Sequence, residues 1–184
     1  SINIVQVIGI FTVFVGVYLT RTGRSKERQV MAETKGRCGD FGKFLSMDVT
    51  CRCGRRHRVE TREVIVRPGA TEEIPSVLER LGLTGKVAVS FDKHVKGIAE
   101  EKVLARLEEA GIPYEALFVE KSGEVRADLA TASELMARIP PDVRTMMSVG
   151  SGTINDLSKY AAAVKGLPYV SVATAASMLS LIHI

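Results

Sequence analysis

The segment VGSGTINDLSKYAA (residues 149–162) contains two glycines that flank a serine, followed by a polar Thr-Ile-Asn-Asp run and an amphipathic stretch. The apolar residues before it, TMMSVG (145–150), predict a short strand, and the residues after it have helical spacing. The sequence therefore predicts a glycine-rich turn from a strand into a helix. Backbone N–H groups in such a turn can approach phosphate oxygens, and the helix dipole there favours negative charge.

Several side chains of this turn suit a phosphate ligand. Gly150 and Gly152 lack a Cβ, so a pyrophosphate can come close to the backbone. Further hydrogen-bond donors are Ser151, Thr153 and Asn155. Asp156 is expected in the first helical turn, where a carboxylate stabilises the helix and orients the loop. The loop is neither GxGxxG nor a Walker A motif, so an ordinary turn capped by Thr153 or Asn155 stays open as the alternative.

A second loop with small and hydroxylic residues follows the next predicted strand, YVSVAT (169–174). Thr174 and Ser177 would lie at the carboxyl end of that strand, beside the glycine loop. Two such neighbouring loops predict a dinucleotide cradle, although small residues also occur where elements simply pack together.

Strands and helices alternate along the middle of the chain, which predicts right-handed crossovers and a parallel sheet. The fold class expected is α/β, a Rossmann-like open parallel sheet with an N-terminal β-hairpin. The hairpin is expected from DVTCRC (48–53) and HRVETREVIVRPG (57–69), separated by a Gly-Arg-Arg turn. The strands expected are 86–92, 114–120, 145–150 and 169–174. The helices expected are 71–82, 96–111, 128–140 and 153–166, the first capped by Thr71 and ended by Gly82.

The composition of the chain argues against a nucleic-acid-binding protein and against a secreted, disulfide-bonded protein. The chain has 184 residues, a formal net charge of +4, no Trp and 5% aromatic residues, which argues against a nucleic-acid partner. Three cysteines, clustered early, do not fit a secreted disulfide framework and favour a reducing compartment, the cytoplasm. A zinc site could be built from Cys38, Cys51, Cys53 and His57. The tight C-x-C spacing favours a reduced hairpin instead, and no metal ligand is expected in this chain.

Both ends differ in character from the middle. Residues 1–30 include an almost uncharged apolar run, 2–19, followed by four basic side chains. We favour translated upstream DNA for residues 1–30, with a membrane anchor and a cytoplasmic domain as the alternative. Residues 179–184, LSLIHI, match the translation of a sequencing-transposon end and are expected to derive from adaptor DNA. The dinucleotide-binding domain is expected to span residues 31–178.

The motif SVGSGTINDLSKYAA…GLPYVSVATAASM resembles the sn-glycerol-1-phosphate dehydrogenases, within the iron-containing alcohol dehydrogenase and dehydroquinate synthase superfamily. The resemblance covers about residues 51–178 and is strongest over 148–178. The early CRCGRRH also resembles the opening hairpin of bacterial members. It implies a Rossmann-like domain followed by a helical metal-binding domain, and reduction of dihydroxyacetone phosphate, a phosphorylated small molecule, to glycerol 1-phosphate with NADH or NADPH and a divalent metal.

The resemblance also assigns site residues. It implies pyrophosphate contacts from Gly152, Thr153, Ile154, Asn155 and Asp156. It implies that the nicotinamide side is lined by Thr174, Ala175, Ala176 and Ser177. Asp92 falls where related dehydrogenases place a group near the adenosine ribose, and a carboxylate there favours NAD over NADP. A plain acidic residue at a helix N-terminus is the alternative for Asp92.

The remaining family features are expected outside these residues. The metal ligands of the family, an acid and two histidines that bind zinc, nickel or iron, belong to the helical domain, which is expected to be absent here. Leu179 stands where the family has an Asp that contacts substrate, so the chain is expected to be inactive alone. A homo-oligomer is compatible with the sequence. The alternatives are a relative of glycerol dehydrogenase or dehydroquinate synthase, or a non-catalytic nucleotide-binding module.

Overall fold

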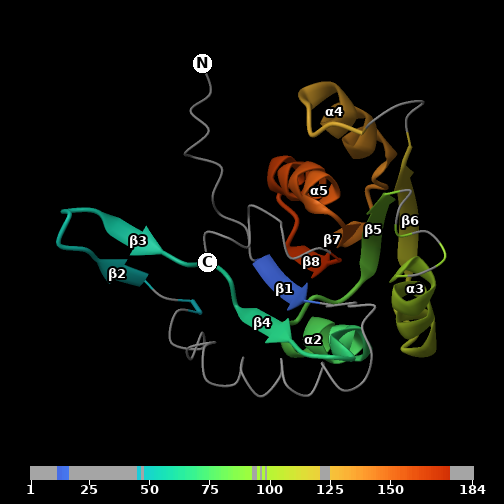
Figure 1. Ribbon diagram of the computed structural model, residues 1–184, viewed down its shortest axis with the longest axis horizontal. Coiled ribbons are helices and arrows are strands. Elements are labelled where there is room, and N and C mark those ends of the chain that lie inside the picture. The colour runs from blue at the N-terminus through green and yellow to red at the C-terminus, as the bar shows by residue number, and fades with distance from the viewer. Residues whose placement is uncertain are drawn as a thin grey trace, which may run out of the picture.

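Six parallel strands form the main sheet of the computed structural model (Figure 1). They are β1 (Thr12–Gly16), β4 (Glu63–Val66), β5 (Lys86–Asp92), β6 (Tyr114–Val119), β7 (Val143–Gly150) and β8 (Tyr169–Ala173). Their spatial order is β4-β1-β8-β7-β5-β6, and each neighbouring pair is parallel. The structure describes residues 12–16, 45–46, 48–92, 95, 97, 99–120 and 125–174. The open parallel sheet expected from the sequence is confirmed.

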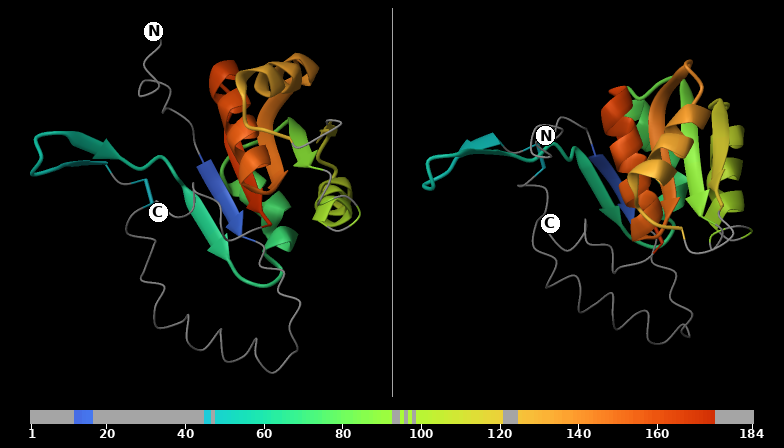
Figure 2. Two further views of the ribbon diagram at one scale, coloured as in Figure 1. Left: turned by 45° about the horizontal axis from the view of Figure 1, so that its top comes forward. Right: turned by 90° about the horizontal axis from the view of Figure 1, so that it is seen from above.

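Helices cover both faces of this sheet, as Figure 2 shows. The helical elements are the 3-10 helix η3 (Ala70–Glu73), α2 (Ile74–Arg80), α3 (Ala99–Glu109), α4 (Leu129–Arg138) and α5 (Gly152–Lys165). One apolar cluster joins η3, α2 and α3 to one face, and a second joins α4 and α5 to the other. Burial on both faces explains why strands such as β5 are almost continuously apolar.

One helix start has a side-chain cap, and another differs from the prediction. At α4 the carboxylate of Asp128 accepts a hydrogen bond from the Thr131 N–H (2.8 Å), a normal N-cap. Thr71 does not cap the first helix, contrary to expectation, because the chain forms η3 there and buries Thr71 within it. Helix α2 begins only at Ile74, with a proline in its first turn.

The region expected to form one long second strand of the hairpin divides into two strands. Strand β3 (Arg56–Arg58) pairs antiparallel with β2 (Asp48–Thr50), which confirms the hairpin. Strand β4 instead joins the main sheet, where it pairs with β1. The hairpin extends away from that sheet in Figures 1 and 2.

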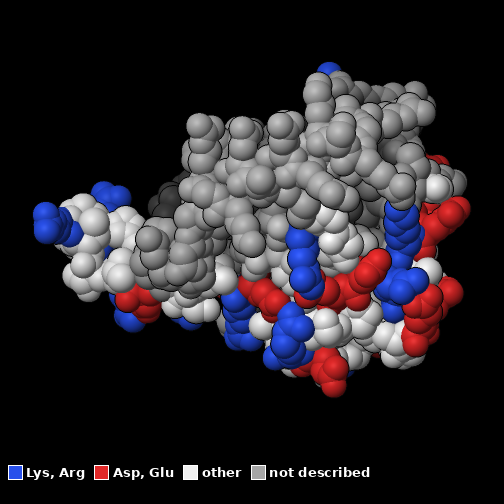
Figure 3. Space-filling view, turned by 60° about the horizontal axis from the view of Figure 1, so that its bottom comes forward, with Lys and Arg blue, Asp and Glu red and all other residues white. Residues whose placement is uncertain are grey.

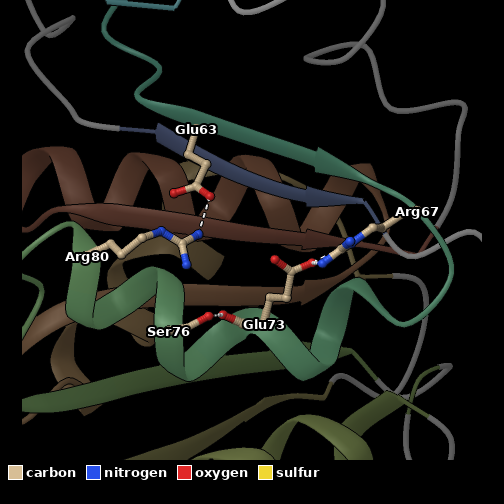
Figure 4. Close-up of polar contacts among 5 residues, drawn as sticks. All are labelled: Glu63, Arg67, Glu73, Ser76 and Arg80. Atoms are coloured by element: carbon tan, nitrogen blue, oxygen red, sulfur yellow. Dashed lines mark hydrogen bonds and ion pairs between the residues drawn. The ribbon is translucent and has the colours of Figure 1, made fainter.

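Surface ion pairs connect β4 to the helical elements that follow it (Figure 4). Arg80 of α2 pairs with Glu63 of β4, and Arg67 pairs with Glu73 of η3. The Ser76 hydroxyl donates to the Glu73 carbonyl (2.9 Å) at the start of α2. Because these arginines are exposed, the pairs add little stability. Charges of both signs are interspersed over the face drawn in Figure 3.

Strand β1 comes from the segment that the sequence places outside the domain. Residues 1–30 are expected to be separate, yet Thr12–Gly16 lies between β4 and β8 in the main sheet. An uncharged apolar run suits an interior parallel strand as well as it suits a membrane span. Across the described ranges, helices are all too short or too polar to cross a bilayer. Residues 1–11, 17–30 and the expected adaptor tail 179–184 lie outside the described residues.

A row of three small polar side chains crosses the centre of the sheet. Ser90 of β5 pairs in register with Ser148 of β7, and Ser148 pairs with Ser171 of β8. All three serines are fully buried. Ser90 bonds Ser158 of α5, Ser171 bonds Asn155 of α5, and Ser148 bonds Tyr169. Their small size lets α5 lie close to the sheet. At that distance the apolar residues of α5 and of the strands pack in one cluster.

Hydrogen bonds fix α5 on this serine row. The Tyr169 hydroxyl donates to Asn155 Oδ1 (2.8 Å) and bonds the Ser148 hydroxyl (2.5 Å). The Ser171 hydroxyl also donates to Asn155 Oδ1 (2.8 Å). Burial raises the pKa of the Tyr169 phenol far above its usual range, so the phenol stays a neutral donor. The buried polar groups therefore satisfy one another and set the position of α5 along the sheet.

The Tyr169→Phe variant should test this network. It removes the phenol and leaves Asn155 and Ser148 with fewer buried partners, so we expect the free energy of unfolding to fall by about 1–3 kcal/mol. Urea unfolding followed by circular dichroism measures the change. The control is Tyr114→Phe, whose hydroxyl bonds Glu108 at the surface and whose loss should cost less than about 0.5 kcal/mol. Equal effects of the two variants would contradict a special role for the Tyr169 network.

Candidate functional site

The strand order places a switch in chain direction between β5 and β7. From β5 the chain crosses to β6 on one side, then returns to form β7 on the other side of β5. In open α/β sheets, ligands bind in the crevice outside the carboxyl ends of the strands at such a switch point. Asp92 is the last residue of β5 and Gly150 the last residue of β7. Two of the residues predicted from sequence thus meet at this point.

Gly150 is required by close packing at the end of β7. A Cβ at this position would overlap Cγ2 of Ile154 and lie 3.0 Å from Oδ2 of Asp92. Backbone and carboxylate can therefore approach each other only because position 150 has no side chain. The glycine brings the first turn of α5 next to the end of β5.

Ser151 connects the glycine loop to Asp92. Its hydroxyl donates to Asp92 Oδ2 (3.1 Å), and its backbone N–H points to the same oxygen (3.4 Å). Ser151 is the N-cap residue of α5, but its side chain makes no capping bond to the helix because the hydroxyl faces Asp92. Asp92 is 6% exposed, so its carboxylate is largely buried at the junction of β5 and the glycine loop.

The N-terminus of α5 supplies backbone donors. The first i→i−4 bond of the helix runs from the Asn155 N–H to the Ser151 carbonyl (3.1 Å). The N–H groups of Gly152, Thr153 and Ile154 precede that bond, and they lie at the positive end of the helix dipole. Gly152 and Thr153 are half-buried, which leaves this end accessible. An anionic oxygen placed here would meet several N–H donors.

Asp156 differs in position from the sequence prediction. Helix α5 begins at Gly152, so its first turn contains no acidic residue and Asp156 falls in the second turn. Its side chain is exposed, and it accepts a hydrogen bond from Asn155 Nδ2 (3.3 Å). Asp156 therefore borders the loop without stabilising the first turn.

Of the other predicted residues that the structure describes, two are buried and one is half-buried. Ile154 and Asn155 are buried, Ile154 in the apolar cluster beneath α5 and Asn155 in the tyrosine network. Thr174 is half-buried, and its N–H donates to the Gly150 carbonyl (3.1 Å), which joins the two predicted loops. Ala175, Ala176 and Ser177 lie outside the described residues.

Sequence reasoning missed the residues that hold α5 in place. These are Ser90, Ser148, Ser171 and Tyr169. A signal was available in the three strand sequences KVAVSFD, TMMSVG and YVSVA, because each has a serine two residues before the end of its strand. Serines at matching positions in neighbouring parallel strands form a row across the sheet.

The residues of this crevice fit a dinucleotide pyrophosphate and do not supply a metal site. Half-buried N–H groups at the start of α5, a glycine at the end of β7 and a nearby carboxylate are features that such a cofactor needs. Within the described ranges, the metal-binding side chains that converge in a group of three or more are Cys51, Cys53 and His57 of the hairpin, not residues of the crevice. A metal at the crevice would need ligands from outside those ranges.

Comparison with known proteins finds a family and relatives whose sequences match the part of the chain that contains this crevice. The family model for iron-containing alcohol dehydrogenase matches residues 65–179, more than half of the 184 residues. A glycerol-1-phosphate dehydrogenase [NAD(P)+] of Geobacillus stearothermophilus is 28% identical over 73% of this chain and 34% of its own length. The Bacillus licheniformis protein of that name is 30% identical over 70% of this chain and 32% of its own.

One solved structure, glycerol dehydrogenase from Schizosaccharomyces pombe, aligns with 55% of this chain and 26% of its own at 22% identity, with a TM-score of 0.45. The chain spans about a third of the length of the curated relatives named above. The matched region begins in β4 and runs past β8, so it contains β5, the glycine loop and α5. The chain belongs to the iron-containing alcohol dehydrogenase family.

Proposed function

We propose that this chain is the cofactor-binding part of an NAD(P)-dependent oxidoreductase that reduces dihydroxyacetone phosphate to sn-glycerol 1-phosphate. The observation that carries the proposal is the junction of Asp92, Gly150 and Ser151 with the N-terminus of α5 at the β5/β7 switch point. The two bacterial relatives described above are named glycerol-1-phosphate dehydrogenase, and these names support dihydroxyacetone phosphate as the substrate.

In this proposal each part of the loop has a separate task. The N–H groups of Gly152, Thr153 and Ile154 bind the pyrophosphate, because they are the donors that precede the first helical hydrogen bond. Gly150 lets the first turn of α5 pack against Asp92, which keeps these N–H donors next to the carboxyl end of β5. Asp92, held by Ser151, accepts hydrogen bonds from the adenosine ribose hydroxyls.

The nicotinamide would lie toward the β8 loop, which begins at Thr174. The Thr174 N–H is bonded to the Gly150 carbonyl, so this loop is fixed relative to the pyrophosphate site. When bound, the cofactor supplies the hydride, and the protein orients it. The divalent metal expected for the family has no ligand set at the crevice among the described residues, so no step is assigned to it.

Gly152→Asp should separate cofactor binding from stability. A carboxylate at the first position of α5 would repel the pyrophosphate, so we expect the NADH dissociation constant to rise at least about tenfold, equivalent to about 1.4 kcal/mol. The same carboxylate interacts favourably with the helix dipole, so the free energy of unfolding should not fall. Titration of NADH fluorescence and urea unfolding measure the two quantities on the same preparation.

The control for this variant is Gly152→Ala, which adds a Cβ without a charge. We expect its NADH affinity to stay closer to that of the unmutated chain than to that of Gly152→Asp. An unmutated chain that does not bind NADH, or a Gly152→Asp chain that binds it unchanged, would contradict the assignment of the pyrophosphate site.

Asp92→Asn should alter the preference between cofactors. Loss of the negative charge removes repulsion of the 2′-phosphate of NADPH, while an amide oxygen can still accept from Ser151. We expect the ratio of the NADPH dissociation constant to that of NADH to fall at least about fivefold, or about 1 kcal/mol. An unchanged ratio, measured by titration with both nucleotides, would restrict Asp92 to holding the loop.

A further inference from the structure

Three metal-binding side chains come together on the β2–β3 hairpin. The thiols of Cys51 and Cys53 and the imidazole of His57 have ligand atoms that all lie within 4.8 Å of one another. Cys53 Sγ is 3.1 Å from His57 Nε2, and the Cys53 N–H lies 3.5 Å from Cys51 Sγ. This cluster belongs neither to the crevice at the carboxyl ends of β5 and β7 nor to the apolar clusters of the fold.

The hairpin backbone explains the convergence. The Gly54 N–H donates to the Cys51 carbonyl (3.0 Å), and the Cys51 N–H donates to the Arg55 carbonyl (2.9 Å), which closes a tight turn. Gly54 has φ 78°, a left-handed conformation that glycine adopts without strain. The turn brings the backbone of Cys53 close to the thiol of Cys51. Strand β3 places His57 opposite Val49, and its imidazole lies next to both thiols.

The spacing suits a tetrahedral metal ion. With zinc–sulfur bonds of about 2.3 Å, two thiolates on one ion lie about 3.8 Å apart, within the span of this cluster. Small side-chain movements would therefore bring all three donors onto one ion. Two thiolates and one imidazole are the soft and borderline donors that zinc prefers over magnesium or calcium. A water molecule or another donor would complete the fourth position.

The charge around the cluster favours thiolates. Four arginines lie within residues 48–58 and favour the thiolate form of nearby cysteines. Basic side chains gather at the far end of the hairpin in Figure 3. Two thiolates would neutralise a divalent ion, so the basic surroundings do not oppose the complex as they would oppose a bare cation.

The hairpin would also gain order from a metal. Each of its strands has three residues, all exposed, and its main side-chain contact is the bidentate pair of Arg56 with Asp48 (2.6 and 2.7 Å). A two-stranded hairpin of this size is marginally stable in water. An ion held by both ends of the turn would fix the hairpin in the form that the structure shows.

We propose that Cys51, Cys53 and His57 form a zinc-binding site on the hairpin. This inference revises the expectation of a reduced, metal-free hairpin, because the structure brings the three donors together. It does not depend on the proposed dehydrogenase function.

Cobalt and zinc titrations of the full chain, kept reduced, test the proposal. We expect one ion per chain, and we expect Co²⁺ to give the near-ultraviolet band of thiolate-to-cobalt charge transfer and the visible bands of tetrahedral coordination. Cys53→Ser and His57→Gln should each raise the zinc dissociation constant at least about 100-fold, since each removes a ligand. Arg52→Ala is the matched control, exposed in the same turn without a metal-binding atom, and should bind unchanged.

Two results would overturn the proposal. One is an unmutated chain that shows no thiolate-to-cobalt band. The other is a zinc affinity that is the same in Cys53→Ser and Arg52→Ala. Circular dichroism of each variant shows that the main sheet is folded, which is expected because the hairpin is a separate sheet with exposed strands. NADH affinity should stay unchanged in all of these variants, which keeps this test separate from that of the cofactor site.

Discussion

The contact between α5 and the buried serine row constrains the rest of the structure. Ser90, Ser148 and Ser171 are small enough for the helix to approach. Ser90 and Ser171 bond side chains of α5 directly, and Ser148 is linked to the helix through the Tyr169 hydroxyl. A larger apolar residue in this row would push α5 away from the sheet. Because the helix begins directly after β7, its distance from the sheet also fixes where its N-terminus lies relative to the end of β5. The geometry of the candidate site therefore follows from packing in the interior.

Buried polarity here stabilises one specific arrangement. The side-chain oxygen of Asn155, Oδ1, accepts hydrogen bonds from the hydroxyls of Tyr169 and Ser171. The Ser158 hydroxyl bonds the Ser90 hydroxyl and donates to the backbone carbonyl of Ile154. A slide of α5 along the sheet would leave these groups unpaired in an apolar interior, at a cost of about 1–3 kcal/mol for each group. The loop can therefore present unpaired backbone N–H groups to a ligand while the helix behind them stays fixed.

The sequence allowed strands β5 to β8, the helices and their alternation to be predicted, because the strands are short apolar runs and each helix has apolar residues at helical spacing and ends close to a glycine or proline. It also placed Asp92 and Gly150 at the ends of apolar strands, and the structure confirms that position for both residues. It placed Asp156 in the first turn of the helix, whereas α5 begins one residue earlier than expected and Asp156 falls in its second turn. The bond between Ser151 and Asp92 joins residues 59 apart in sequence, so local pattern does not indicate it. The convergence of Cys53 with His57 depends on the turn geometry of the hairpin, and strand β1 on pairing with distant segments, so neither follows from local pattern.

We propose that a dinucleotide pyrophosphate binds at the N-terminus of α5, at the β5/β7 switch point. The most direct measurement is an NMR titration of the ¹⁵N-labelled chain with NAD⁺, following the backbone amides. We predict that the largest shifts at saturation occur at Ser151, Gly152, Thr153 and Ile154, with smaller shifts at Asp92. Saturable shifts confined to other parts of the chain, or no shifts at these amides, would contradict the account.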